Sequence, residues 1–195
     1  LILTLRYIIL PHIEDYRGDI EHLISASLDL PVAIGSIDAH WDGLHPWLAL
    51  HQVQLHDRQH HPALTLDNIE AELSWASLLV FDIRLNRLEL LAPTLNIRRD
   101  AAGHITVAGL SLDPRASTQD NALANWLLAQ RRIIIRDARI EWLDQWRQAP
   151  SLTLERVNLL VQNNGRRHRF GLTAVPPIEL ASHIDLRGDF SGDNL

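Results

Sequence analysis

The stretch Ile133–Asn164, IIIRDARIEWLDQWRQAPSLTLERVNLLVQNN, contains the same pattern of apolar residues twice. In each copy apolar residues alternate with other residues, two spacer residues follow, and the alternation then resumes. The copies consist of Ile133, Ile135, Ala138, Ile140 and Trp142, and of Leu152, Leu154, Val157, Leu159 and Val161. Alternation with period two is typical of a β-strand that has one apolar face.

The two spacers predict a β-bulge within each of these strands. Successive side chains of a regular strand point to opposite faces, so a double spacer would send the second group of apolar residues to the wrong face. One extra residue in a bulge restores a single apolar face and increases the local twist. The pattern therefore predicts long, twisted and bent strands with one apolar side.

The same pattern recurs upstream. The copies are Val32, Ile34, Ile37, Ala39 and Trp41; Leu48, Leu50, Val53 and Leu55; Leu64, Leu66, Ile69, Ala71 and Leu73; and Ile83, Leu85, Leu88 and Leu90. Most copies begin 16 or 19 residues apart, which fits a strand plus a turn and indicates an antiparallel meander. An ordinary β-sandwich with similar strands is the alternative. The repetition favours a mainly β, elongated array that forms an open apolar groove, in which each strand mainly meets its neighbours.

Two helices are predicted beside the strands. The first covers residues 11–30 and has an apolar face that consists of Ile13, Tyr16, Ile20, Leu23, Ile24 and Leu28. It is expected to pack on the edge of the sheet. A second, short helix is predicted over Asp120–Gln130, with Leu123, Trp126 and Leu127 on one side.

The first ten residues, LILTLRYIIL, are apolar apart from Thr4 and Arg6. Ten residues are too few to cross a bilayer, which needs about 20. From the residues alone, the segment is interpreted either as a buried segment or as the end of a transmembrane helix.

The composition narrows the function classes. The chain has 195 residues, a formal net charge of −6 and no Cys, which argues against a general nucleic-acid binder and excludes disulfides and thiol chemistry. Residues 131–169 nevertheless contain nine Arg and only four acidic residues. We interpret this local excess as a solvated outer face and hairpin tip. Attraction to anionic lipid headgroups is the alternative.

The sequence contains no signature of catalysis or of cofactor binding. The motifs HExxH, GxSxG, GxGxxG and the P-loop do not occur. Six His fall within residues 40–61, but they occupy polar strand faces or lie beside turns. They are interpreted as surface residues rather than as ligands of zinc or copper. No enzyme activity, metal or cofactor is therefore expected.

Five segments of the chain carry a likeness to a known family. They are LPHIEDYRGDIEHLISASLDLPVAIGSIDAHWDGLHPWLALHQVQLHD, LTLDNIEAELSWASLL, LLAPTLNIRRDAAGHITVAG, NWLLAQRRIIIRDARIEWLD and NGRRHRFGLTA, in this order. Together they resemble the YhdP-type members of the AsmA-like envelope proteins, from about Leu10 to Gly192.

The resemblance implies an N-terminal inner-membrane helix, a very long periplasmic β-groove and a role in moving phospholipid to the outer membrane. Residues 1–10 would be the end of the single-pass anchor, residues 11–30 an amphipathic helix, and residues 31–195 the membrane-proximal start of the groove. The expected partners are phospholipid, the inner membrane and other envelope proteins, with no nucleic acid. The alternative is a non-enzymatic structural or assembly module of the envelope that packs its apolar face on protein partners.

The resemblance offers no catalytic residues, and it implies that the apolar strand positions contact lipid. These positions are Val32, Ile34, Ile37, Leu48, Leu50, Val53, Leu64, Leu66, Ile69, Ile83, Leu85, Leu88, Ile133, Ile135, Ile140, Trp142, Leu152, Leu154, Val157 and Leu159.

Overall fold

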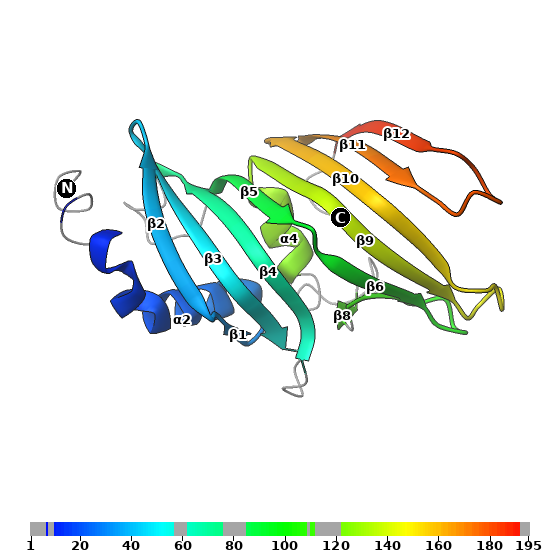
Figure 1. Ribbon diagram of the computed structural model, residues 1–195, viewed down its shortest axis with the longest axis horizontal. Coiled ribbons are helices and arrows are strands. Elements are labelled where there is room, and N and C mark those ends of the chain that lie inside the picture. The colour runs from blue at the N-terminus through cyan, green and yellow to red at the C-terminus, as the bar shows by residue number, and fades with distance from the viewer. Residues whose placement is uncertain are drawn as a thin grey trace.

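The computed structural model describes Tyr7 and residues 10–56, 62–75, 85–108, 110–111 and 122–191. These residues form one open sheet of 12 strands, the α-helices α2 (Arg17–Leu28) and α4 (Ala122–Ala129), and the 3-10 helix η2 (Leu10–Tyr16) (Figure 1). The mainly β fold predicted from the sequence is confirmed. The expected anchor segment lies outside the described residues except for Tyr7 and Leu10. Within the described ranges no helix is both long enough and apolar enough to span a membrane.

The strands follow the predicted repeat. They are β1 (Val32–Ala33), β2 (Ser36–Asp42), β3 (His45–His56), β4 (Pro62–Leu73), β5 (Leu85–Leu91), β6 (Thr94–Arg99), β7 (Ile105–Val107), β8 (Leu110–Ser111), β9 (Arg132–Asp144), β10 (Leu152–Asn164), β11 (Arg167–Val175) and β12 (Ile184–Ser191). Their order in the sheet is β1-β3-β4-β5-β9-β10-β11-β12, with β2 beside β3 and β6 beside β9.

The sheet departs from a pure antiparallel meander at one place. Strands β5 and β6 both pair with β9 in parallel, so that Leu88 lies opposite Ile133 and Leu95 lies opposite Ile140. Parallel neighbours require a crossover connection. Here the chain continues from β6 through β7 and β8, which belong to the same sheet, and α4 then precedes β9. The parallel pairs make the sheet mixed.

The bulges predicted for β9 and β10 occur at their double spacers, where the register of the pair shifts. A left-handed residue also occurs at the double spacer of β3. Gln52 in β3, Asp137 in β9 and Arg156 in β10 have positive φ angles of 53°, 54° and 48°. This left-handed conformation costs a non-glycine residue about 1–2 kcal/mol. In β9 and β10 the Asn158 side chain offsets part of the cost, because it accepts a hydrogen bond from the Asp137 N–H (3.2 Å) and donates one to the Arg156 carbonyl (3.0 Å).

Backbone hydrogen bonds join two of these positions to neighbouring segments. The Ala92 N–H, where φ is 47°, donates to the Arg136 carbonyl (2.8 Å), which places Ala92 beside the bulge at Asp137. Gly35 lies in the same way beside Gln52, and its N–H donates to the His51 carbonyl (3.0 Å).

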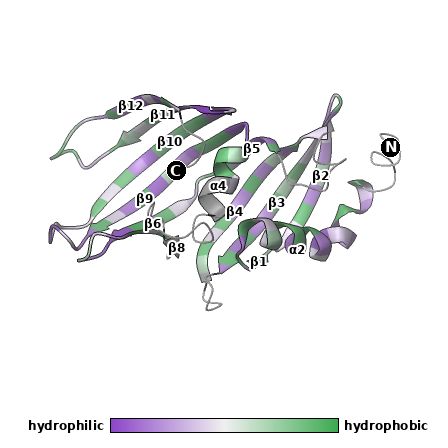
Figure 2. Cartoon of the chain, turned by 180° about the vertical axis from the view of Figure 1, so that it is seen from behind, coloured by the Kyte–Doolittle hydropathy of each residue, from purple (hydrophilic) through white to green (hydrophobic). Residues whose placement is uncertain are grey.

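Helices α2 and α4 lie on one face of the sheet, over its first half (Figure 2). We call this face of the whole sheet the inner face and the opposite one the outer face. The buried core between helices and strands consists of Leu28, Val32, Ile34, Ile37, Leu48, Leu50, Val53, Leu55, Leu66, Ile69, Ala71, Leu85 and Leu88. Ile20 and Ile24 of α2 and Trp126 and Leu127 of α4 pack against it. The second helix is therefore present as predicted, although Asp120 and the Leu123 side chain lie outside the described residues.

Helix α2 also caps the edge of the sheet, as the sequence predicted. Polar side chains along η2 and α2 accept hydrogen bonds from the edge backbone: Glu14 Oε2 from Ile37 N–H (2.8 Å), Glu21 Oε1 from Ile34 N–H (2.6 Å) and Ser25 Oγ from Val32 N–H (2.9 Å). An edge strand normally leaves such groups open to another strand. The helix therefore ends the sheet at β1 and β2.

Candidate functional site

The inner face of β9–β12 carries a second apolar cluster. The helices of the described residues lie over the first half of the sheet and leave these strands largely uncovered (Figure 2). The floor of the cluster consists of Ala138, Val157 and Ala174, which are each 1% exposed and lie next to the bulges. Partly buried side chains surround the floor: Ile135, Ile140, Leu154, Leu172 and Ile184. The apolar alternation of the sequence thus becomes one continuous surface here.

Exposure on this face increases toward β12, the last strand that the structure describes. Leu186 lies opposite Leu172 and is 54% exposed, and Phe190 lies opposite His168 and is 38% exposed. Contiguous apolar side chains that remain in water are typical of a surface that binds a ligand or a partner. The inner face of β9–β12 is therefore the candidate functional site.

A buried polar network borders the site at the hairpin end of β10. The Gln130 side chain is fully buried, accepts a hydrogen bond from the Leu85 N–H (2.8 Å) and donates one to the Trp126 carbonyl (2.6 Å). Asn163 donates to the Gln130 carbonyl (2.7 Å), and its Oδ1 lies 2.8 Å from His168 Nδ1. The network ties the end of α4 to β5, β10 and β11.

A charged cluster borders the site at the other end of β9. Asp144 is buried and lies opposite Arg99, with 3.9 Å between Arg99 Nη1 and Asp144 Oδ2. The Arg99 guanidinium stacks on the Trp146 ring at 4.1 Å, and Trp146 itself is 51% exposed. Between the two polar borders, the apolar row on β9 runs from Ile133 to Trp142, a distance of about 30 Å at ~3.3 Å per residue.

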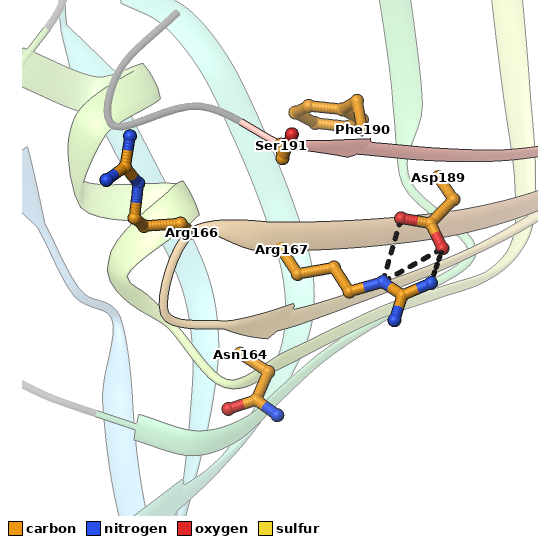
Figure 3. Close-up of a pocket in the computed structure, with 6 residues that line it drawn as sticks. All are labelled: Asn164, Arg166, Arg167, Asp189, Phe190 and Ser191. Carbon is orange, nitrogen blue, oxygen red and sulfur yellow. Dashed lines mark hydrogen bonds and ion pairs between the residues drawn. The ribbon is translucent and has the colours of Figure 1, made fainter.

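A separate pocket of about 500 Å³ lies at the β10–β11 hairpin, lined by Asn164, Arg166, Arg167, Asp189, Phe190 and Ser191 (Figure 3). Arg167 donates hydrogen bonds of 2.6–3.1 Å to both carboxylate oxygens of Asp189, and the Arg166 side chain extends away from this pair. These bonds lower the pKa of Asp189 and raise that of Arg167. Because the two charges already satisfy each other, we interpret the pocket as a structural ion pair.

The outer face carries a partly buried ion-pair cluster. Glu89 is buried and accepts hydrogen bonds from Arg87 and Arg136. Burial alone would raise the pKa of Glu89, but the bonds from the two guanidiniums lower it below its usual range. This cluster joins β5 to β9 on the side opposite the apolar site.

The histidines of residues 40–61 that the structure describes make separate contacts. His40 stacks on Trp47, His45 contacts Glu72 at 2.9 Å, and His51 contacts Asn68 at 2.9 Å. The described part of the chain contains no group of three or more His, Asp or Glu that could hold a metal ion.

The predicted lipid-contacting residues divide into two groups. Those from Val32 to Leu88 that the structure describes lie in the core under α2 and α4, and Ile83 lies outside the described residues. Those from Ile133 to Leu159 lie on the inner face of β9 and β10. That either group contacts lipid stays a prediction.

The prediction from sequence omitted the inner-face residues of β11 and β12. These are Phe170, Leu172, Ile184, Leu186 and Phe190. Neither strand carries the double spacer, so the repeated pattern did not include them. Their simple period-two alternation is the signal that would have found them.

A family model described as YhdP protein matches residues 1–195. No curated protein and no solved structure matches the chain.

Proposed function

Because this chain belongs to the YhdP family, we propose that it is the membrane-proximal part of an inner-membrane-anchored bridge that carries phospholipid through the periplasm toward the outer membrane. The family supports a role in the envelope connected with lipid transport. The observation that carries the proposal is the open apolar inner face of β9–β12 between two polar borders. In this proposal residues 1–10 belong to the anchor.

The physical chemistry of phospholipid fits this surface. Each CH₂ that leaves water gains about 0.8 kcal/mol, so exposing two acyl chains costs roughly 20–25 kcal/mol. An apolar face removes most of this cost. Headgroups can remain in water beside Arg99 and the exposed Trp146, which border the face at one end.

The apolar row is also long enough for an acyl chain. The hydrocarbon core of a bilayer is about 30 Å thick and contains two chains end to end, which gives about 15 Å per chain. The inner face of β9 between its polar borders is about 30 Å long. A chain can therefore lie on this face with its headgroup at a polar border.

A second candidate function is a structural module that packs its apolar face on protein. The observation that favours it is the first half of the sheet, where α2 and α4 already cover the inner face. If another envelope protein covered β9–β12 in the same way, no lipid would be needed.

Bound lipid distinguishes the two functions. We expect gently purified protein to release phospholipid on solvent extraction, measured by mass spectrometry. The matched variants are Leu159→Asp and Leu160→Asp, because these neighbours in β10 lie on the inner and the outer face and Leu160 is exposed.

A carboxylate in an apolar path costs several kcal/mol, so Leu159→Asp should lower bound phospholipid at least tenfold while Leu160→Asp leaves it unchanged. Circular dichroism melting verifies that both variants fold. Wild-type protein without lipid, or an equal loss in both variants, would favour the structural module.

A further inference from the structure

We propose that α2 and α4 end the lipid path inside this chain, so that acyl chains contact the inner face of β9–β12 only and α4 forms the wall at the closed end. The inference rests on the proposed function and adds which part of the sheet contacts lipid. It excludes the first half of the repeat, whose apolar pattern is the same.

The two halves of the sheet share one face. Across the parallel junction, Leu88 lies opposite Ile133 and Leu90 lies opposite Ile135. All four side chains belong to the inner apolar rows. The strands alone would therefore offer a lipid the same surface on both sides of the junction.

The two halves of the sheet differ because the helices cover only the first half. On β3 and β4, Leu50 and Leu66 are each 6% exposed and belong to the core that Ile20, Ile24 and Leu127 cover. On β11 and β12, Ala174 and His168 are buried, but Phe170, Leu172, Ile184, Leu186 and Phe190 stay partly or largely exposed. The apolar side chains of α2 and α4 thus occupy the place that acyl chains would need.

Buried hydrogen bonds fix α4 at the boundary. Gln130, which follows α4, accepts a hydrogen bond from the N–H of Leu85, the first residue of β5. Its carbonyl accepts one from the side chain of Asn163, near the end of β10. Removing one partner of a buried hydrogen bond leaves the other unsatisfied, which makes the displacement of α4 unfavourable. Helix α4 is therefore a fixed wall, and lipid reaches the site over a border of β9–β12 or from the β12 side.

The repeat itself supplies the matched comparison. Leu66 in β4 and Leu154 in β10 both directly precede the double spacer, and both point to the inner face. The Leu66 side chain is buried, whereas the Leu154 side chain is only partly buried. Photo-leucine, which differs little from leucine in size, can replace the leucines of the whole chain without a bulky probe in the core.

After irradiation with phospholipid bound, mass spectrometry of peptides locates the lipid adducts. We expect adducts at Leu154 at least tenfold above those at Leu66, where the products are cross-links to α2 or α4. Equal adducts at both positions would overturn the inference and leave the proposed function intact. Adducts at neither position, with lipid absent from the extract, would overturn the proposed function as well.

A variant tests whether α4 is the wall. Gln130→Ala removes the bonds to the Leu85 N–H and the Trp126 carbonyl, and we expect lipid adducts at Leu66 to rise at least tenfold. Gln54→Ala, an exposed glutamine on β3, is the control and should leave the adducts unchanged. If Gln130→Ala leaves Leu66 free of lipid while the helix is shown to be displaced by faster amide exchange, another element closes the path and the assignment of α4 is wrong.

Discussion

The Phe170 ring crosses β12 at a residue that has no side chain. Phe170 lies opposite Gly188, and a Cβ at Gly188 would lie 2.2 Å from Phe170 Cε1. The ring therefore depends on Gly188 for its place on the inner face. Gly171, in the neighbouring strand, has no atom within 4 Å of the position of a Cβ.

This contrast gives a prediction for two glycines of the same sheet. Gly188→Ala should displace Phe170 and lower the free energy of unfolding by about 1–3 kcal/mol, the usual cost of overpacking. Gly171→Ala should leave stability unchanged or raise it by up to about 1 kcal/mol, because glycine weakens a strand. Urea denaturation measures both. An equal loss of unfolding free energy in the two variants would show that the position of Phe170 does not depend on Gly188.

The Glu89 carboxylate should make the stability of the fold depend on pH. Its bonds to Arg87 and Arg136 lower its pKa in the folded state below the ordinary value of 4.5. These bonds therefore stabilise the fold fully above pH 4.5, and their contribution is lost as the pH falls through the folded-state pKa.

Glu89→Gln should lower the free energy of unfolding at pH 7 by about 1.5–3 kcal/mol, the range for hydrogen bonds to charged groups. It should also flatten the loss of stability below pH 4.5. Thermal melts at several pH values measure both effects. Glu155→Gln, an exposed carboxylate, is the control. A pH profile that Glu89→Gln leaves unchanged would contradict the role of this pair.

At the scale of residues, the sequence predicted the face on which a side chain lies better than it predicted the residue to which that side chain bonds. The double spacers predicted the bulges that occur at Asp137 and Arg156. They did not predict that Asn158 would bond to both bulges. Nor did they predict the bond from Arg136 to Glu89, because that contact depends on the register of two parallel strands that are distant in sequence.

At the scale of elements, α2 supplies hydrogen-bond acceptors to the backbone at the edge of the sheet, as a neighbouring strand would. The N–H of Ile34 is bonded to Glu21, and Ile34 itself is buried. Removing the Glu21 carboxylate takes the acceptor away from this donor. The helix thus contributes hydrogen bonds as well as apolar contact.

Glu21→Ala should therefore lower the free energy of unfolding by about 1–3 kcal/mol, the cost of a buried donor without an acceptor. Glu21→Gln keeps an acceptor oxygen and should recover most of the loss. Amide exchange at Ile34, measured with the melting temperature, separates this bond from a general loss of helix packing. Equal stability of the alanine and glutamine variants, with slow exchange at Ile34 in both, would contradict the capping role.

The sequence predicted most elements within a few residues. The copy of the pattern from Leu48 to Leu55 lies in β3 (His45–His56), and the copy from Leu64 to Leu73 lies in β4 (Pro62–Leu73). The parallel pairing of β5 and β9 was not predictable, because 50 residues separate the two copies of the pattern and periodicity does not specify how such a connection folds back. The position of α4 depends on the same connection.

At the scale of the whole molecule, one continuous apolar face is divided by what covers it. Period-two alternation interrupted by double spacers predicted the apolar face correctly for the described residues. Alternation describes each strand separately, however, and contains no information on where a distant helix packs. The sequence therefore assigned Leu50 and Leu154 the same role, although one lies under α2 and α4 and the other does not.

The central claim is that acyl chains lie on the inner face of β9–β12. The most direct measurement places a benzophenone amino acid at Leu159 or at Leu160 and irradiates cells whose phospholipids are radiolabelled. The two leucines are neighbours in β10, on opposite faces of one strand. The account predicts labelled protein for Leu159 at a level at least tenfold above that for Leu160, whereas equal labelling at both positions, or none at Leu159, would contradict it.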